Sequence, residues 1–192
     1  MKKLLFLLPL VLFVTWCSQA PQQEVQLSTG VNAVIVSTVN ALAAKNITAL
    51  SSLVSEKWIR FSPYGYVDTG RDVVMQSTEL FSFWNSSNVR EWWLFDWSGE
   101  PIVLTFKDYF SKFIYDADFV SLAQTFVNQR FERGNIINNV FDVYTWAYIV
   151  ELYVPGVDPQ YDGMDRKSLH LVFVQEQWLW KLRALIHGQW TI

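Results

Sequence analysis

The fold is decided by residues 166–192, RKSLHLVFVQEQWLWKLRALIHGQWTI. Apolar residues occupy alternate positions in 167–173 and again in 178–186, which is typical of two strands that each cover a core with one face. The polar triplet 175–177 separates the two runs. The stretch therefore predicts an antiparallel hairpin, and its apolar faces need a partner layer from the upstream chain.

The upstream chain supplies helices for that layer. Apolar positions recur at helical spacing in 31–42 and again in 47–54, with Asn46 between them as the end of the first helix and the cap of the second. Residues 140–154 are rich in β-branched and aromatic side chains and predict one long central strand. The region 115–139 has no clear pattern. Shorter strands are expected at 58–61 and 73–75, and helices at 80–84 and 105–114. Thr105, with Asp108 three residues later, predicts a capping-box-like start of the second of these helices.

Helices followed by strands that end in a long antiparallel sheet indicate an α+β fold. The chain has 192 residues and 51% hydrophobic content, which is enough for one sizeable core and too short for two. We therefore expect a single domain over residues 30–192. A leader at 1–17 precedes it, followed by a polar, Gln-rich tether at 18–29.

The leader has the parts of an export signal. Two lysines at 2–3 precede an apolar run at 4–14, and this run is shorter than the roughly 20 residues that span a bilayer. Cys17 is the only cysteine, and residues 14–18 resemble the lipobox of bacterial lipoproteins, which implies a lipid on Cys17. The expected location is then the cell envelope, with the protein anchored in a membrane. Cleavage after Ala20, giving a secreted or periplasmic soluble protein, is the alternative.

Composition argues against several classes of partner. The formal net charge is −3, and without the two leader lysines 13 basic residues face 18 acidic ones. No Lys/Arg cluster occurs, so nucleic-acid binding is not expected. Neither His170 nor His187 has a Cys or carboxylate at ligand spacing, so no metal site is expected. No nucleophile or phosphate-binding motif is present, and no cofactor is expected.

Two motifs at opposite ends of the expected domain carry a family resemblance. Residues 60–68 and 186–192 are similar to a group of uncharacterised bacterial exported lipoproteins, in which an acidic residue usually occupies the position of Gly188. The order of elements around 162–173 resembles the nuclear transport factor 2-like and ketosteroid isomerase-like (SnoaL-like) cone superfamily. This resemblance implies a curved antiparallel sheet wrapped over N-terminal helices, as in cystatin-like cones. It also implies a pocket at the wide end of the cone and often a homodimer through the outer face of the sheet.

The superfamily suggests candidates for acid–base chemistry. An isomerase of this kind needs a carboxylate base in an apolar cavity and a tyrosine or acid that stabilises an enolate. The candidates are His187, Asp96 and Tyr66. His187 stands at the end of the last predicted strand, near Trp190, where a histidine also commonly satisfies a backbone group.

The aromatic content predicts a ligand surface. The sequence holds ten tryptophans, and aromatic walls give large apolar contact at low entropy cost. Five of them, at positions 58, 84, 146, 178 and 180, fall where periodicity demands core residues. A buried Arg60 would need a carboxylate from the protein or from a ligand. The candidates for a pocket or interface are Arg60, Tyr64, Tyr66, Trp92, Trp93, Trp97, His187 and Trp190.

Three functions stay open at this point. The sequence favours an exported, lipid-anchored domain that binds a small apolar or amphipathic molecule or a partner in the envelope. The first alternative is an enzyme of the cone superfamily that carries out proton transfer or hydrolysis on a small molecule. The second is a non-catalytic structural or dimerisation module.

Overall fold

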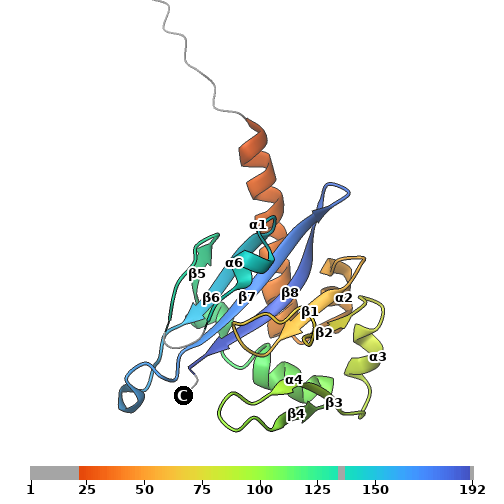
Figure 1. Ribbon diagram of the computed structural model, residues 1–192. Coiled ribbons are helices and arrows are strands. Elements are labelled where there is room, and N and C mark those ends of the chain that lie inside the picture. Colours follow the sequence, from red (N-terminus) through yellow and green to blue (C-terminus); the bar gives the residue numbers. More distant parts are fainter. Residues whose placement is uncertain (1–21, 134–136, 191–192) are drawn as a thin grey trace, which may run out of the picture.

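The computed structural model describes residues 22–133 and 137–190 of the chain (Figure 1). The expected leader at 1–17, with Cys17, lies outside the described residues, as do Thr191 and Ile192 at the end of the terminal motif. The fold is mixed α+β with a mostly antiparallel sheet, as the sequence predicts.

Six strands form the main sheet, in the order β2-β1-β8-β7-β6-β5. Neighbouring strands run antiparallel except β1 and β8, which pair in parallel. Two further strands form a separate antiparallel ribbon. The main strands are β1 (Ile59–Ser62), β2 (Val73–Met75), β5 (Gln124–Val127), β6 (Tyr148–Val154), β7 (Lys167–Glu176) and β8 (Leu179–Gln189), and the ribbon is β3 (Arg90–Leu94) with β4 (Pro101–Leu104).

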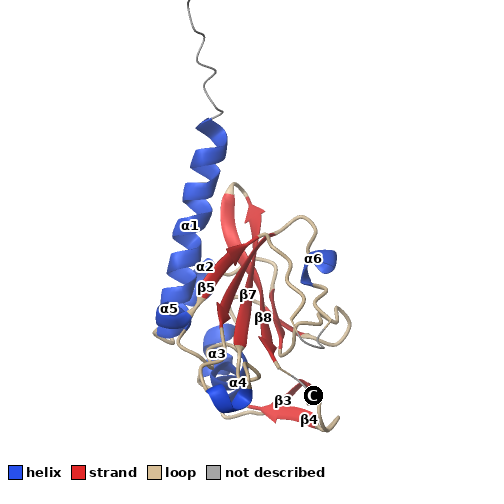
Figure 2. Cartoon of the chain, turned by 90° about the vertical axis from the view of Figure 1, so that its left-hand side faces the viewer, coloured by secondary structure: helices blue, strands red, loops and turns tan. Residues whose placement is uncertain are grey.

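Helices cover one face of this sheet, which we call the inner face (Figure 2). Buried residues of α1, α2 and α4 share one apolar core with those of β6, β7 and β8. The outer face is covered in part by α6 and by the loop after β1, which form a second, smaller core around Val67, Val140 and Tyr144. The helices are α1 (Gln22–Ala43), α2 (Ile47–Leu53), α3 (Leu80–Trp84), α4 (Phe106–Phe113), α5 (Phe119–Leu122) and α6 (Val140–Val143), with a 3-10 turn η1 (Pro159–Tyr161).

The predicted helix caps are present. The Asn46 side chain accepts a hydrogen bond from the Ala49 N–H at 3.0 Å, and Thr105 accepts one from the Asp108 N–H at 3.2 Å; both bonds satisfy donors that a helix start leaves open. The first helix begins further upstream than expected, at Gln22. Residues 22–29, interpreted from sequence as tether, are therefore helical in the structure.

The terminal hairpin is confirmed, but its periodicity breaks inside β8. Phe173 pairs with Leu182 and Val172 with Ala184, so Arg183 is an additional residue in a β-bulge. A bulge reverses the faces that follow it. The alternation expected over 178–186 is therefore wrong after Leu182, since Ala184 and the residues in phase with it face outward. His187 pairs with Leu169 and faces the helices.

Two tryptophans assigned to the core by periodicity are exposed instead. Trp178 belongs to the hairpin turn, because the strands pair as far as Glu176 and Leu179. Trp146 is 65% exposed because the expected strand over 140–154 is interrupted. Its first residues form α6 and a turn, and β6 begins only at Tyr148. Packing of Val140 and Tyr144 over the outer face outweighs their strand propensity.

Aromatic side chains fill the space between the sheet and the helices. The Trp92 ring stacks on Tyr109 with 3.8 Å between centroids, and Phe61 meets both rings edge-on. Trp92 also donates from its indole nitrogen to the Leu104 carbonyl at 3.0 Å. The part of the sheet where an apolar ligand would be expected is thus packed with the protein's own side chains.

Candidate functional site

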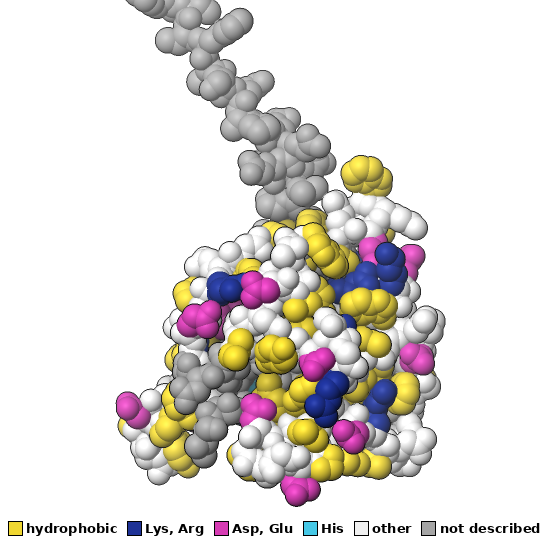
Figure 3. Space-filling model, in the orientation of Figure 1, with side chains coloured by type: hydrophobic (Ala, Val, Ile, Leu, Met, Phe, Trp, Pro, Cys, Tyr) yellow, Lys and Arg dark blue, Asp and Glu magenta, His cyan; other side chains and the backbone are white. Residues whose placement is uncertain are grey.

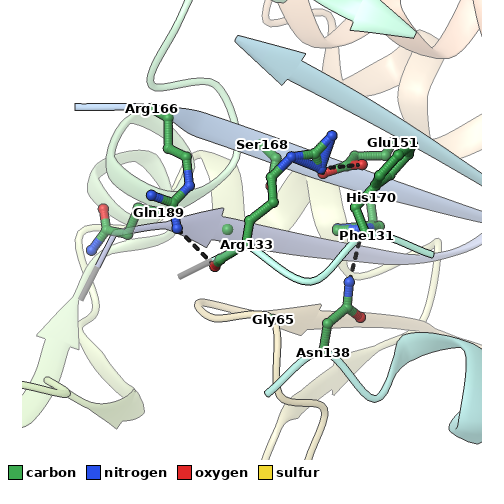
Figure 4. A pocket seen from close by; sticks show the side chains of 10 residues that line it. Gly65, Phe131, Arg133, Asn138, Glu151, Arg166, Ser168, His170 and Gln189 are labelled. Atoms are coloured by element: carbon green, nitrogen blue, oxygen red, sulfur yellow. Dashed lines mark hydrogen bonds and ion pairs between the residues drawn. The ribbon is translucent and has the colours of Figure 1, made fainter. Parts of the chain in front are cut away.

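A small pocket opens on the outer face of the sheet, near the ends of β6, β7 and β8 that lie away from the hairpin turn (Figure 4). Its interior volume is about 40 Å³, which is room for a water molecule or a group of similar size. A larger molecule would extend through the mouth. We call it the outer-face pocket; its polar side chains are Arg133, Asn138, Glu151, Arg166, Ser168, His170 and Gln189, and Gly65, Phe131 and Gly188 complete the wall.

Arg133 is held in place from several sides. Its Nη1 lies 2.9 Å from both carboxylate oxygens of Glu151, which is buried on β6. The guanidinium carbon also lies 3.9 Å from the centroid of the Tyr153 ring and 4.3 Å from that of Phe131. Ion pairing and cation–π contact both favour a guanidinium. Arg133 is therefore a fixed positive group at the pocket wall.

His170 stands beside this pair on β7. Burial lowers the pKa of His170 to about 4, and the positive charge of Arg133 acts in the same direction. The ring is therefore neutral at physiological pH. Its Nε2 lies 3.4 Å from the Asn138 side-chain nitrogen, so a neutral ring accepts a hydrogen bond there and carries its proton on Nδ1. Burial also raises the pKa of Glu151, against the opposing effect of Arg133.

Arg166 contributes a second guanidinium. Its Nη2 donates to the Arg133 carbonyl at 2.8 Å, and its guanidinium carbon lies 4.8 Å from the centroid of the Trp190 ring. Among residues 30–133 and 137–190, no carboxylate lies within ion-pair distance of Arg166. The described wall thus holds two guanidiniums, one carboxylate and a neutral imidazole, with a net positive charge.

Gly188 leaves the floor of the pocket without a side chain. A Cβ placed on it would lie 2.3 Å from the Ser168 hydroxyl oxygen, closer than two such atoms approach, so a side chain at this position would displace Ser168. An acidic side chain there would also cancel the net charge of the wall. The glycine therefore suits a pocket that holds an anion.

His187, the leading catalytic candidate, lies elsewhere, on the inner face and fully buried. Its Nδ1 is 3.1 Å from the Pro63 carbonyl oxygen and its Nε2 is 3.0 Å from Asp116 Oδ2. Both partners are acceptors, so both bonds form together only on the imidazolium. Neither ring nitrogen is left to take a proton from a substrate. The contact with Pro63 matches the alternative raised from sequence, a histidine that satisfies a backbone group.

Asp116 Oδ2 also lies 3.0 Å from the Nζ of Lys167, so one carboxylate oxygen contacts both His187 and Lys167. Burial alone would raise the pKa of Asp116, but the hydrogen bond and charge of His187 and the charge of Lys167 outweigh it and lower the pKa. The network joins the end of β8 to the loop after β1 and to the chain after α4. We interpret it as a structural link.

The other catalytic candidates are not brought to His187 as partners. Asp96 is exposed between β3 and β4, and its backbone N–H lies 3.4 Å from the Tyr64 hydroxyl, which accepts. Tyr66 is exposed in the loop after β1. The carboxylate that binds His187 is Asp116, which the sequence did not single out.

The remaining pocket candidates scatter over the fold. Arg60 pairs with a carboxylate of the protein itself, Asp72, at 3.6 Å. Of the set predicted from sequence, only Trp190 adjoins the outer-face pocket, through Arg166. Tyr64 and Trp92 lie in the inner core. Trp93 lies beneath the guanidinium of Arg71. Trp97 packs on Phe95 at the surface.

Sequence reasoning missed Arg133, Arg166, Asn138 and Ser168. Glu151 is the residue whose sequence context could have indicated this pocket, because it is a charged residue inside the apolar strand run at 148–154. A buried charge requires a partner, and searching for that partner would have led toward Arg133.

Comparison with protein-family models, curated proteins and solved structures finds no match for the chain. Within the part of the chain that the structure describes, no three His, Cys, Asp or Glu side chains gather closely enough to hold a metal ion. In the same residues, no helix combines the length and apolar character needed to cross a bilayer.

Proposed function

We propose that this protein is an exported domain, anchored through a lipid on Cys17, that binds small anionic molecules in the outer-face pocket. The observation that carries the proposal is the net positive charge of the pocket wall. The leader and the lipobox-like residues 14–18 support the location. Helices packed on one face of a mostly antiparallel sheet support membership of the cone superfamily.

The preferred ligand is a carboxylate, either a small acid or the head of an amphipathic molecule. A guanidinium forms two parallel hydrogen bonds with a carboxylate, which adds geometric selection to charge attraction. Arg133 uses Nη1 for Glu151, and Arg166 uses Nη2 for a carbonyl. The other nitrogens of Arg166 make no hydrogen bond or ion pair with the side chains and backbone that the structure describes, and we expect the ligand to bind them, while Asn138 and Ser168 add neutral polar contacts on the wall.

The pocket favours an anion over a purely apolar molecule. The inner core, where aromatic walls were expected to hold such a molecule, is filled by Trp92 and Tyr109. The enzyme alternative gains no support from His187, whose two nitrogens are both engaged. Dimerisation through the outer face would have to accommodate α6, which already covers part of it.

Calorimetric titration tests the proposal. A Cys17→Ser chain, which removes the lipid, is titrated with acetate, succinate and inorganic phosphate. We expect saturable binding of the carboxylates and a loss of at least about tenfold in affinity for Arg166→Gln, since one charged hydrogen bond contributes roughly 1.5–3 kcal/mol. Arg71→Gln is the matched control, because Arg71 lies on Trp93 away from the pocket. Equal affinity in both variants would contradict the assignment.

The anchor has its own test. Cells that express the wild-type chain or Cys17→Ser are fractionated. The wild-type chain is expected in the membrane fraction and the variant in the soluble fraction. Membrane association that survives the substitution would count against a lipid on Cys17.

A further inference from the structure

The tip of the β7–β8 hairpin presents large apolar side chains to solvent. Trp178 is 89% exposed and Leu179 is 61% exposed, and with Gln177 they form what we call the hairpin tip. Figure 3 shows a hydrophobic group protruding from the upper end of the molecule, where Figure 1 places this hairpin. Exposed aromatic groups at the end of a projecting element are suited to contact with another phase or molecule.

The turn itself gives no reason for a tryptophan at this place. Gln177 has φ +47° and Trp178 has φ +68°, so both central residues of the two-residue turn are left-handed. Such turns favour Asn-Gly and similar pairs, and a bulky residue there is strained. Because Asn or Gly would form the turn at lower energy, the strain at Trp178 favours a role for the indole side chain itself.

The surface next to the tip is also apolar. A cleft of about 270 Å³ runs between the hairpin and α1 and includes Val34, Leu53 and Trp180 in its walls. A Cβ placed on Gly30 of α1 would lie 3.9 Å from Cδ1 of the Trp180 ring, so this ring lies against the helix at Gly30. Arg183 pairs with Glu176, whereas Lys181 in the cleft wall donates to the Ser52 carbonyl at 2.9 Å and has no carboxylate partner among residues 30–133 and 137–190. Contact at this end of the molecule would therefore be apolar and aromatic, with one positive charge beside it.

The tip lies at the end of the molecule where the chain enters α1 (Figure 1). Gly30 is eight residues into α1, or about 12 Å from the helix start. Cys17 precedes Gln22 by five residues, a reach of at most about 18 Å. A lipid on Cys17 would therefore hold a bilayer within about 30 Å of Gly30, which lines the same cleft as Trp178 and Leu179 of the tip.

We propose that the hairpin tip inserts into the interface of the membrane that holds the lipid of Cys17. The inference rests on the lipid anchor of the proposed function. Tryptophan and leucine are suited to the boundary between head groups and acyl chains, and a second contact strengthens attachment through a lipid chain.

This contact would also orient the domain. Ser168, at the outer-face pocket, lies nine residues along β7 from the turn at Gln177, which is about 30 Å of strand. With the tip in the interface, the pocket is held away from the membrane and open to the aqueous space. This arrangement suits a ligand that arrives from solution.

A site-specific fluorophore tests the contact. In the lipidated protein Cys17 is blocked, so Leu179→Cys supplies the one free thiol for an environment-sensitive nitrobenzoxadiazole label. Val103→Cys is the control, because Val103 is 47% exposed on β4, at the opposite end of the molecule (Figure 1). Both proteins are reconstituted on vesicles of phosphatidylethanolamine and phosphatidylglycerol. The label at 179 is expected to shift to shorter wavelength and to be quenched by doxyl lipids, and the label at 103 is not.

The outcomes separate this inference from the anchor. Vesicle-bound protein whose label at 179 stays unshifted overturns the tip contact and leaves the anchor standing. A shift that appears without vesicles and grows with protein concentration would assign the tip to a second copy, and it also overturns the membrane contact. A chain that stays soluble with Cys17 in place overturns the anchor and the contact together.

Discussion

One nitrogen of Arg133 holds both oxygens of Glu151: Nη1 lies 2.9 Å from each. The pair is partly buried on the outer face of the sheet, and it leaves the second guanidinium of the pocket, that of Arg166, without a described carboxylate partner. The balance between these three groups determines what the pocket attracts.

Glu151→Gln should make the pocket more positive and the fold less stable. The substitution removes the carboxylate and leaves Arg133 with a weaker neutral acceptor, at a cost of roughly 1–3 kcal/mol in unfolding free energy. Carboxylate affinity should rise at the same time. Urea unfolding and calorimetry on one preparation measure both effects, with Glu132→Gln as the neighbouring exposed control. Weaker carboxylate binding in the Glu151 variant would contradict the proposed charge balance.

His170 should make the fold sensitive to acid. Its pKa is about 4 in the folded protein against an ordinary value of 6.5, so the unfolded chain binds more protons between these values. Its contribution is fully present above pH 6.5 and is lost as the pH falls toward 4.

The matching measurement is urea unfolding of wild type and His170→Gln across this pH range. Relative to the variant, the wild type should lose roughly 3 kcal/mol between pH 6.5 and 4, the free energy of a shift of this size. Parallel stability curves for the two proteins would show that His170 is not held neutral by burial.

Asp116→Asn should destabilise the fold and change ligand affinity little, because Asp116 reaches the pocket wall only through Lys167, which donates to Gln189 Oε1 at 3.0 Å. The change removes the buried partner of His187 and Lys167, and breaking a buried ion pair costs about 3 kcal/mol or more. Because the pKa of Asp116 is lowered, its contribution is present at neutral pH and is lost as the pH falls below the ordinary range of an aspartate. Thermal unfolding measures the loss of stability, and carboxylate titration of the folded variant measures the ligand affinity. A selective loss of binding would implicate this network in the site.

Trp178→Gly should stabilise the hairpin and weaken its membrane contact. Glycine accepts φ +68° without steric cost, and the gain is about 1 kcal/mol. The label at position 179 should then insert less deeply into vesicles. Unfolding free energy and doxyl quenching give the two readouts. A variant with lower stability and undiminished quenching would contradict the inference that Trp178 strains the turn and contacts the membrane.

The sequence predicts those parts of the fold that depend on local pattern. Alternation over 167–173 predicts β7, and the caps at Asn46 and Thr105 predict the starts of α2 and α4. The bulge at Arg183 has no such signal, because one inserted residue changes the face of everything after it without a glycine or proline to mark it. The alternation of apolar residues therefore could not predict on which face of the sheet His187 lies.

The site was less predictable than the fold. Arg133 comes from the patternless region 115–139 and reaches Glu151 only through tertiary packing. Large aromatic residues indicated a ligand wall, yet Trp92 serves the core and Trp178 projects from a turn. Aromatic composition alone does not separate these roles. A buried charge within an apolar strand, as at Glu151, is the more specific signal.

The most direct test of the account is a crystal structure of the Cys17→Ser chain grown with 4-bromobenzoate, whose bromine marks the ligand by anomalous scattering. We expect the carboxylate within hydrogen-bond distance of Arg166, in the outer-face pocket, with the ring extending through the mouth. An anomalous peak within the inner core beside Trp92, or no peak at the outer-face pocket at saturating ligand, would contradict the proposed function.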